Sequence, residues 1–399
     1  MDVDFARSQF PALAGDWIFL DNAGGSQVLR AVADRVRDYL LSTSVQLGAT
    51  YDASRRAAER VQEGVRAAAT LVGSDPGEVV LGSSATQLVS NLARAMEDQL
   101  GPGDEIVVTI ADHEANITPW LRLEERGVEV KVWRLREEVL DLADLDALMT
   151  PRTRLVCFTQ ATNILGTIHP VEEITRFVHE RGARVCVDGV AYAPHRLVDV
   201  RAWDVDFYVL SLYKVFGPHL GLLYGKREHL LELANINHLF LSRDAVPYKL
   251  QPGNVSYELA WGLPAIVEYL EEQGRRAGGE GDARELMAAA FDAIARHEAE
   301  TVAPLLAHLA GMEGVRVLGR TDPAPGGRVA TVSFVVEGRS SSEIPRQLEA
   351  HRIGVRYGDF HARRLVQDLG HAERGGVVRI SLGHYNTAAE IARVCEALG

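Results

Sequence analysis

Cysteine is scarce in this chain of 399 residues, with three copies at positions 157, 186 and 395. Their odd number and wide spacing fit neither a disulfide framework nor a zinc site. Free cysteines are commonly buried, so we expect reduced thiols that mostly lie in the core. Small disulfide-stabilised secreted domains and zinc modules are therefore poor descriptions of this protein.

Basic residues are outnumbered by acidic ones. The chain has 42 Lys and Arg against 55 Asp and Glu, which gives a formal net charge of −13. Binding to a nucleic-acid backbone or to an anionic membrane requires concentrated positive charge. We therefore expect neither nucleic acid nor membrane among the partners.

Long apolar runs are absent as well. The longest apolar-looking stretch, residues 205–224, is interrupted by Asp206, Lys214 and Pro218, so it is too polar to span a membrane. The first ten residues carry Asp2 and Asp4 where a secretory signal would have basic residues and an apolar segment. These patterns predict a soluble, cytoplasmic protein.

Short β-branched runs alternate with segments of helical length. Apolar residues spaced three and four apart predict helices over residues 28–42, 53–72, 86–99, 170–180 and 259–273. Consecutive apolar residues, typical of strands covered by helices on both faces, predict strands over residues 78–81, 105–109, 128–133, 154–159, 184–187 and 206–210. This order predicts an α/β domain with a mainly parallel sheet.

A glycine-rich stretch, residues 274–282, interrupts this pattern and suggests a flexible surface insertion or linker. A helix is expected beyond it over residues 285–309 and another over residues 387–398, with strands over residues 315–318, 329–336 and 377–382. We therefore predict a large α/β domain over residues 20–275 and a small α+β domain over residues 284–399. Residues 1–19 are expected to pack on one of these two domains, and we predict that they pack on the small domain.

The first stretch with a chemical signature is residues 81–88, where a strand ends in small hydroxyl residues and a helix begins. Ser83, Ser84 and Thr86 lie at this junction. Unpaired N–H groups and the positive end of the helix dipole suit a phosphate group there. The other interpretation is a helix N-cap and nothing more, because serine and threonine are favoured at that position in any case.

Asp188 follows the predicted strand at residues 184–187. An unpaired buried carboxylate is costly, so Asp188 is expected to have a cationic partner. Ligands of open α/β sheets bind at the carboxyl ends of the strands, which favours a functional acid. A helix cap or a structural ion pair would explain the same residue.

Lys214 follows the apolar strand at residues 206–210. Burial of a lysine lowers its pKa and makes the amine a usable nucleophile. The alternative is a surface lysine whose stem covers apolar neighbours.

A phosphate cradle, a buried acid and a nucleophilic lysine together are the parts that pyridoxal 5′-phosphate requires, with the lysine forming a Schiff base and the acid holding a proton on the pyridine nitrogen. From about residue 19 to the C-terminus the sequence resembles the class V aminotransferase family of fold type I enzymes, in its cysteine desulfurase and selenocysteine lyase branch. The resemblance implies a large domain with a mainly parallel, seven-stranded sheet and a smaller α+β domain.

The resemblance also assigns cofactor contacts. The phosphate-binding residues that it implies are Ser84, Ala85, Thr86, Ser211 and Tyr213. It implies that His113, in the run Asp112-His113-Glu114, stacks on the cofactor ring, that Asn163 lies near the ring oxygen, and that Asp188 and Lys214 are the ring-nitrogen acid and the Schiff-base lysine. Asn254 falls where a neighbouring subunit reaches the phosphate in related enzymes, which implies a homodimer with shared sites.

On the substrate side, the resemblance assigns the α-carboxylate of an amino acid to Arg379, in the run Val378-Arg379-Ile380-Ser381. Guanidinium suits this task because it can bind a carboxylate with two hydrogen bonds. Asn22, in the opening strand motif, and His361 are the other predicted substrate-binding residues.

Two positions depart from the family pattern. Desulfurases keep a catalytic cysteine on a loop that corresponds to residues 356–362, and His361 stands near that place here. Ala191 stands where a glutamine commonly contacts the cofactor's ring oxygen, so Tyr192 or a water molecule would have to make that contact.

These residues predict an enzyme that uses pyridoxal 5′-phosphate on a small α-amino acid. Lys214 would remove the α-proton, and the missing loop thiol favours a lyase that eliminates a sulfur or selenium group from Cβ. Transamination and racemisation or epimerisation are alternatives within the same family. A non-catalytic scaffold that keeps the fold is a third interpretation.

Overall fold

The computed structural model describes residues 1–399 and contains a central sheet of seven strands in the order β2-β8-β7-β6-β5-β3-β4. The strands are β2 (Val79–Gly82), β3 (Glu105–Thr109), β4 (Glu129–Trp133), β5 (Thr153–Thr159), β6 (Arg184–Asp188), β7 (Phe207–Ser211) and β8 (Gly221–Gly225). The neighbouring pairs from β7 to β4 are parallel, and β8 alone runs antiparallel to both of its neighbours. The predicted mainly parallel sheet is confirmed.

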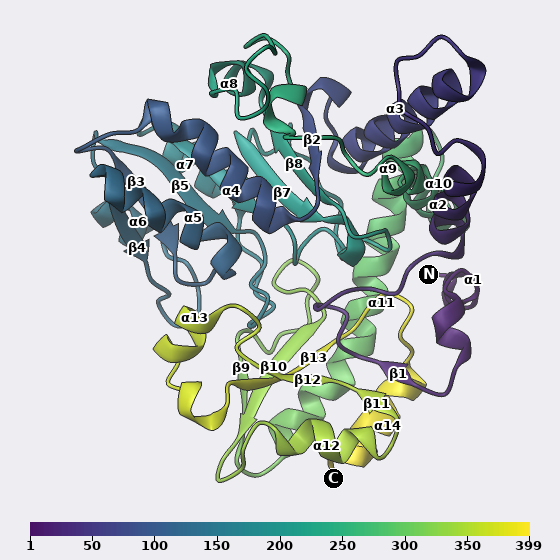
Figure 1. Ribbon diagram of the computed structural model, residues 1–399. Coiled ribbons are helices and arrows are strands. Elements are labelled where there is room, and N and C mark those ends of the chain that lie inside the picture. Colours follow the sequence, from purple (N-terminus) through teal and green to yellow (C-terminus); the bar gives the residue numbers. More distant parts are fainter.

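Helices cover both faces of this sheet (Figure 1). Leu81, Phe158 and Val187 share one core with α2 (Arg30–Ser42), α3 (Asp52–Val72), α7 (Val171–His179), α9 (Tyr257–Gly262) and α10 (Pro264–Arg276). Alternate strand residues such as Val80 and Val209 face a second core under α4 (Ala85–Met96), α5 (Thr118–Leu121) and α8 (Arg227–Glu232). A short helix, α6 (Leu142–Leu148), follows β4. Burial on both sides explains why the strands are apolar on consecutive residues.

The sequence prediction did not include the short helices α5, α6 and α8, and two further elements of the large domain differ from it. The helix expected over residues 259–273 is divided between α9 and α10, because Pro264 lacks the N–H that would continue α9 and instead begins α10. Strand β8 was not among the predicted strands, since the glycines at its two ends are unfavourable in strands. Gly221 is needed because a Cβ there would lie 2.4 Å from the Ser84 carbonyl carbon, just before α4.

The small domain has a four-stranded antiparallel sheet in the order β12-β13-β10-β9. Its strands are β9 (Val315–Leu318), β10 (Thr331–Val336), β12 (Arg356–Gly358) and β13 (Val377–Ser381), and its helices are α12 (Glu343–Glu349), α13 (Arg363–Asp368) and α14 (Ala388–Leu398). The predicted α+β architecture of the C-terminal part is confirmed.

One long helix, α11 (Ala283–Gly311), packs in the core of the large domain and in the core of the small domain. Phe291 and Ile294 join the core of the large domain, whereas Leu305 and Leu309 join that of the small domain. The glycine-rich segment before α11 is a short turn between packed helices rather than a flexible insertion, and a Cβ at Gly274 would lie 2.0 Å from the Leu286 carbonyl oxygen. The domain limits at residues 275 and 284 stay a prediction.

The N-terminal segment lies against both domains. After α1 (Val3–Ser8), Phe10 packs in the large-domain core. Strand β1 (Ile18–Phe19) then pairs in parallel with β11 (Ile353–Gly354), beside the small-domain core. Residues that follow β1 therefore lie where the two domains meet.

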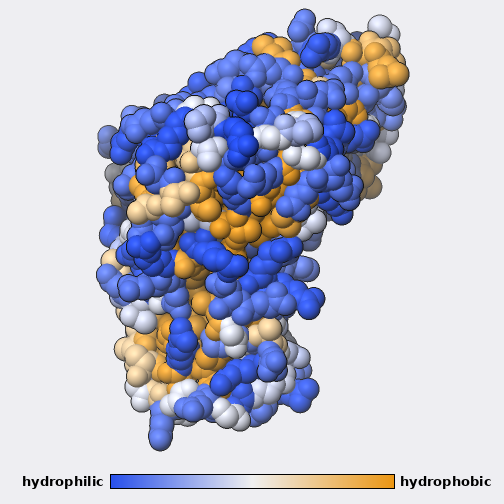
Figure 2. Space-filling view, turned by 90° about the vertical axis from the view of Figure 1, so that its left-hand side faces the viewer, coloured by the Kyte–Doolittle hydropathy of each residue, from blue (hydrophilic) through white to orange (hydrophobic).

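The surface on the left-hand side of Figure 1 is mostly hydrophilic, with apolar side chains gathered in a strip across its middle (Figure 2). None of the helices combines the length and the hydropathy that a membrane crossing would require.

Candidate active site

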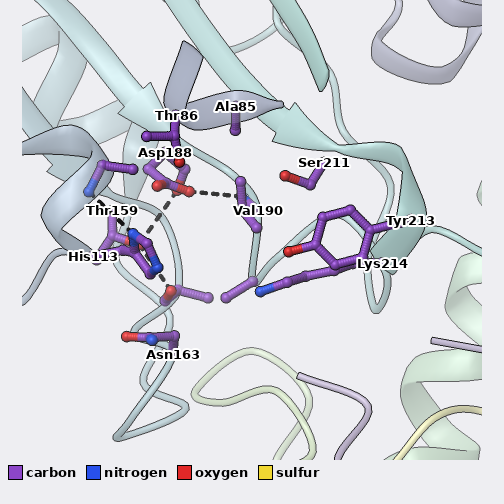
Figure 3. Close-up of a pocket in the computed structure, with 13 residues that line it drawn as sticks. Ala85, Thr86, His113, Thr159, Asn163, Asp188, Val190, Ser211, Tyr213 and Lys214 are labelled. Atoms are coloured by element: carbon purple, nitrogen blue, oxygen red, sulfur yellow. Dashed lines mark hydrogen bonds between the residues drawn. The ribbon is translucent and has the colours of Figure 1, made fainter. Parts of the chain in front are cut away.

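A pocket of about 460 Å³ opens at the carboxyl ends of β5, β6 and β7, beside the first turn of α4. Most of the predicted site residues line it together: Ala85, Thr86, His113, Asn163, Asp188, Ser211, Tyr213 and Lys214. Figure 3 shows their side chains converging from separate elements around one space. The carboxyl edge of a parallel sheet is where ligands of such folds bind.

Asp188 is the last residue of β6 and is 5% exposed. Its Oδ1 accepts a hydrogen bond of 2.8 Å from the Val190 backbone N–H. Burial raises the pKa of Asp188 to about 6, although the Val190 N–H and the Lys214 amine act in the opposite direction. A protonated pyridine nitrogen would supply the cationic partner that this carboxylate lacks.

Lys214 ends a short 3₁₀ turn directly after β7 and is 8% exposed. Burial, together with the Arg379 charge, lowers the pKa of Lys214 to about 8. The amine extends into the pocket (Figure 3), and no protein group hydrogen-bonds it. A buried amine that loses its proton near neutral pH can attack an aldehyde.

His113 forms a wall of the pocket at the start of a 3₁₀ turn, Glu114–Asn116. Its Nδ1 accepts a hydrogen bond of 3.0 Å from the Ala115 backbone N–H. Burial, with smaller effects from the charges of Lys214 and His361, lowers the pKa of His113 to about 3. The ring is therefore neutral, with its proton on Nε2, and a neutral flat ring can lie against a cofactor ring without charge repulsion.

The first turn of α4 forms the end of the pocket that suits a phosphate. Ala85 and Thr86 line the pocket there, with Ser211 and Tyr213 across from them. The Ser84 hydroxyl does not line it, because Ser84 Oγ accepts the Gln87 N–H at 3.1 Å as the N-cap of α4. The capping interpretation thus holds for the Ser84 side chain, while its neighbours leave the helix start open to a ligand.

Arg379 lies in β13, directly opposite Arg356 of β12. Its Nη2 is 3.0 Å from Asp21 Oδ1, its Nη1 donates to the Asn163 carbonyl at 3.2 Å, and its Nε has no partner. The guanidinium lies 3.8 Å from the centre of the Phe360 ring. Arg379 is thus held next to the pocket wall formed by Asn163, with one buried donor free.

Asn163 uses its amide nitrogen to donate to the Phe360 carbonyl at 3.0 Å, and its buried Oδ1 has no partner. This unpaired acceptor at the pocket fits the expected contact to a hydroxyl on the cofactor ring. Asn22 differs, because its amide donates to the carbonyls of Phe19 and Ser381 and its oxygen accepts from Tyr385. The structure does not bring the Asn22 side chain to the pocket.

Two further predicted residues lie outside the main pocket. Asn254 lines a separate cavity of about 500 Å³ with Ser83 and Gln87. His361 lines a cavity of about 900 Å³ that adjoins the pocket through shared walls at Thr86, His113 and Tyr213.

Some residues at the site were not predicted. Asp112 is buried close to Asp188, and burial and the Asp188 charge raise the pKa of Asp112 well above its usual range. Ala191 lines the pocket as expected, but Tyr192 packs edge-on against Trp203 instead of lining it. Tyr192 therefore does not replace the missing glutamine. For Asp112, the sequence signal that could have predicted a place at the site is its acidic side chain directly before His113.

The residues present fit pyridoxal 5′-phosphate: an open helix start for the phosphate, a carboxylate without a cation, an unpaired amide oxygen and an amine of lowered pKa meet in one pocket. Comparison with known proteins agrees with this chemistry. The family model "Aminotransferase class-V" matches residues 18–394.

Several relatives match over nearly their whole length. The chain is 40% identical to the aminotransferase-like protein FGM3 of Gibberella zeae, covering 99% of this chain and 97% of that protein. It is 35% identical to the cysteine desulfurase-like protein ustD of Aspergillus flavus, covering 100% and 90%. The crystal structure of the cysteine desulfurase CsdA from Escherichia coli matches with a TM-score of 0.83 and 27% identity, covering 100% of this chain and 98% of that one. The chain therefore belongs to the class V aminotransferase family, in its cysteine desulfurase-like branch, and is an enzyme that depends on pyridoxal 5′-phosphate.

Proposed function

We propose that this enzyme acts on a small α-amino acid and eliminates a sulfur- or selenium-containing group from its Cβ. The observation that carries the proposal is the loop at residues 356–362, which faces the site with His361 and contains no cysteine. Cys157 and Cys186 are buried within the central sheet, and Cys395 lies on α14. With no thiol to accept sulfur, a sulfur group that leaves Cβ has to depart into solvent.

When bound, pyridoxal 5′-phosphate supplies an aldehyde that takes up the substrate amine and a ring that accepts electrons from the α-carbon. Asp188 holds the proton on the ring nitrogen, since its carboxylate has no other cationic partner. Lys214 moves the α-proton, because burial leaves its amine basic but not permanently charged. Arg379 binds the α-carboxylate with its free Nε, next to Asp21.

His113 is the flat wall of the pocket. Because its Nδ1 is occupied by the Ala115 N–H, the ring cannot rotate freely, and this hydrogen bond fixes the orientation of the ring. The role of His113 in the proposal is to hold the reacting bond in line with the cofactor ring.

We also propose a homodimer with shared sites. The cavity that Asn254 lines also includes Ser83, directly after β2, and Gln87, in the first turn of α4, which are close in sequence to Ala85 and Thr86 at the phosphate end of the pocket. The family resemblance of Asn254 to a residue that acts across subunits supports this arrangement. Light scattering of the purified protein tests the stoichiometry, and a monomer with full activity would contradict it.

The test of the reaction is an assay of purified enzyme with L-cysteine, selenocysteine and a cysteine S-conjugate, with products identified by mass spectrometry. Elimination predicts pyruvate, ammonia and the released heteroatom group. No product from any of the three would contradict the proposal.

Transamination is the second candidate, favoured by the similarity to an aminotransferase-like protein at 40% identity. It predicts a shift of the cofactor absorbance to that of the pyridoxamine form when an amino acid is added. Exchange of the α-proton with retained sulfur would indicate a racemase or epimerase instead.

A further inference from the structure

The loop that carries His361 is hydrogen-bonded to segments that line the pocket and the adjoining cavity. The His361 carbonyl accepts the Glu114 N–H at 2.8 Å, and the Phe360 carbonyl accepts the Asn163 amide at 3.0 Å. Arg364, just after the loop, forms an ion pair of 2.9 Å with Glu114. These contacts join the small domain to two segments of the large domain that line the pocket.

The loop backbone is strained at this point. Phe360 and His361 have φ angles of +50° and +59°, in the left-handed region that bulky residues rarely adopt. Such strain persists only where surrounding contacts fix the backbone, and it is common at functional sites. The hydrogen bonds on both sides of His361 supply that fixation.

The His361 side chain projects into the cavity next to the pocket. Its ring centre is 5.2 Å from that of His113, and both rings line the cavity of about 900 Å³. No protein group hydrogen-bonds the His361 ring, which is exposed to solvent. His113 cannot serve as an acid here, because its ring is neutral and its Nδ1 is already occupied.

We propose that His361 is the proton donor to the sulfur or selenium atom that leaves Cβ. This inference rests on the proposed elimination. The Cβ–S bond breaks with both electrons going to sulfur, and the sulfur takes the proton of the His361 imidazolium and departs as hydrogen sulfide from cysteine or as a thiol from an S-conjugate. The electrons of the Cα–H bond form the new carbon–carbon double bond, the α-proton goes to Lys214, and His361 regains a proton from solvent. Nothing is oxidised or reduced by an outside reagent, and water completes the release of pyruvate and ammonia.

Several titratable or charged groups face the cavity that His361 lines. From the large domain these are His113, Glu114, Arg122 and the Tyr213 phenol. On its own segment, Asp359 accepts the His361 N–H at 3.0 Å, and Arg364 follows within one turn.

The test compares two substrates in His361→Gly and His361→Gln variants. Glycine suits the positive φ of this position, so the backbone is not disturbed. L-Cysteine needs a proton on its leaving sulfur, whereas β-chloro-L-alanine loses chloride, which needs none. We expect elimination from cysteine to slow by about 100-fold in both variants, the range typical of general acid catalysis, while elimination from β-chloroalanine changes less than about twofold.

Three further readouts separate acid catalysis from a structural role. In both His361 variants, the rate with cysteine should no longer fall on the alkaline side of the pH profile as it does in the wild-type enzyme. Free imidazole should restore part of the rate of His361→Gly and should not change the rate of a His351→Gly control, whose exposed histidine lies elsewhere in the small domain. The visible absorbance of the bound cofactor should stay that of the wild type in all variants.

Equal slowing with both substrates, or wild-type rates with both, would overturn the role of His361. If the wild-type enzyme releases chloride from β-chloroalanine but no sulfur or selenium group from cysteine, selenocysteine or a cysteine S-conjugate, the proposed function itself fails and this inference fails with it. That outcome is distinct, because it is seen before any variant is made.

Discussion

Arg379 Nη2 and Asp21 Oδ1 lie 3.0 Å apart, and the same carboxylate is 3.3 Å from Arg356 through its other oxygen. Asp21 thereby fixes the guanidinium that the proposed function assigns to the substrate carboxylate. A preoriented guanidinium loses little freedom when it binds its ligand, so this ion pair serves the site as well as the fold.

Replacing Arg379 tests this arrangement. Arg379→Lys retains the charge but removes the planar fork, so one hydrogen bond to the substrate carboxylate is lost. We expect KM for the amino-acid substrate to rise about 10- to 100-fold, as for loss of a hydrogen bond to a charged group. Steady-state kinetics measure this, with the exposed Arg363→Lys as control. An unchanged KM would remove Arg379 from the substrate site.

Gly221→Ala tests the support of the phosphate end. A Cβ at residue 221 would lie 2.4 Å from the Ser84 carbonyl carbon and 2.6 Å from the Ala85 nitrogen, so the start of α4 must shift. Overpacking of this kind costs about 1 to 3 kcal/mol, and we expect weaker retention of the cofactor. Dialysis followed by absorbance measures retention. Gly101→Ala, which has no neighbouring atom within 4 Å, is the matched control, and equal cofactor loss in both would contradict the prediction.

Asp206 predicts a pH-dependent stability far from the pocket. Burial would raise its pKa, but hydrogen bonds from His179, His229 and the Val185 N–H lower the pKa of Asp206 well below its usual range. Its contribution is therefore present above the unfolded pKa of about 4 and is lost as the pH falls. The Asp206 hydrogen bond raises the pKa of His179, so the histidine's contribution is present below about pH 6.5 and is lost as the pH rises through the raised value.

We expect Asp206→Asn to lower the free energy of unfolding by about 3 kcal/mol near pH 5 to 6. The reason is that the donors of His179, His229 and Val185 would then face a neutral amide instead of a carboxylate. The difference from wild type should shrink toward pH 3 and also as the pH rises through the raised pKa of His179. Urea unfolding across this range measures it. Asp204→Asn, an exposed neighbour of the same groups, should cost much less. A constant difference at every pH would contradict the assigned linkage.

Asp188 should make the cofactor-free protein less stable while it serves the reaction. Its pKa is raised to about 6 in the folded chain, so stability falls as the pH rises from about 4, where the unfolded carboxyl ionises, through 6. Asp188→Asn should therefore stabilise the cofactor-free protein by about 1 to 3 kcal/mol at pH 8, yet change nothing at pH 4.

The same variant should slow turnover of the loaded enzyme, because asparagine cannot hold a proton on the ring nitrogen. Thermal unfolding of the cofactor-free form and an activity assay check the two effects, with exposed Asp34→Asn as control. Lower stability of Asp188→Asn at pH 8 would contradict the account.

Much of the large domain could be predicted from the sequence because its strands are buried on both faces and read as continuous apolar runs. The pocket residues at the carboxyl ends of such strands, among them Asp188 and Lys214, could also be predicted. The contact of Asp21 with Arg379 could not, because it joins segments 358 residues apart and depends on how β1 lies against the small domain. Strand β8 was missed because close packing, rather than strand propensity, requires its first glycine. The cytoplasmic location stays a prediction.

The central claim is a covalent link between the Lys214 amine and the cofactor aldehyde. Borohydride reduction of the loaded enzyme, followed by digestion and mass spectrometry, tests it directly. We expect the reduced cofactor on the peptide that contains Lys214, and a Lys214→Ala variant that carries no such adduct. Attachment to another lysine, or no adduct on an enzyme that still turns over its substrate, would contradict the account.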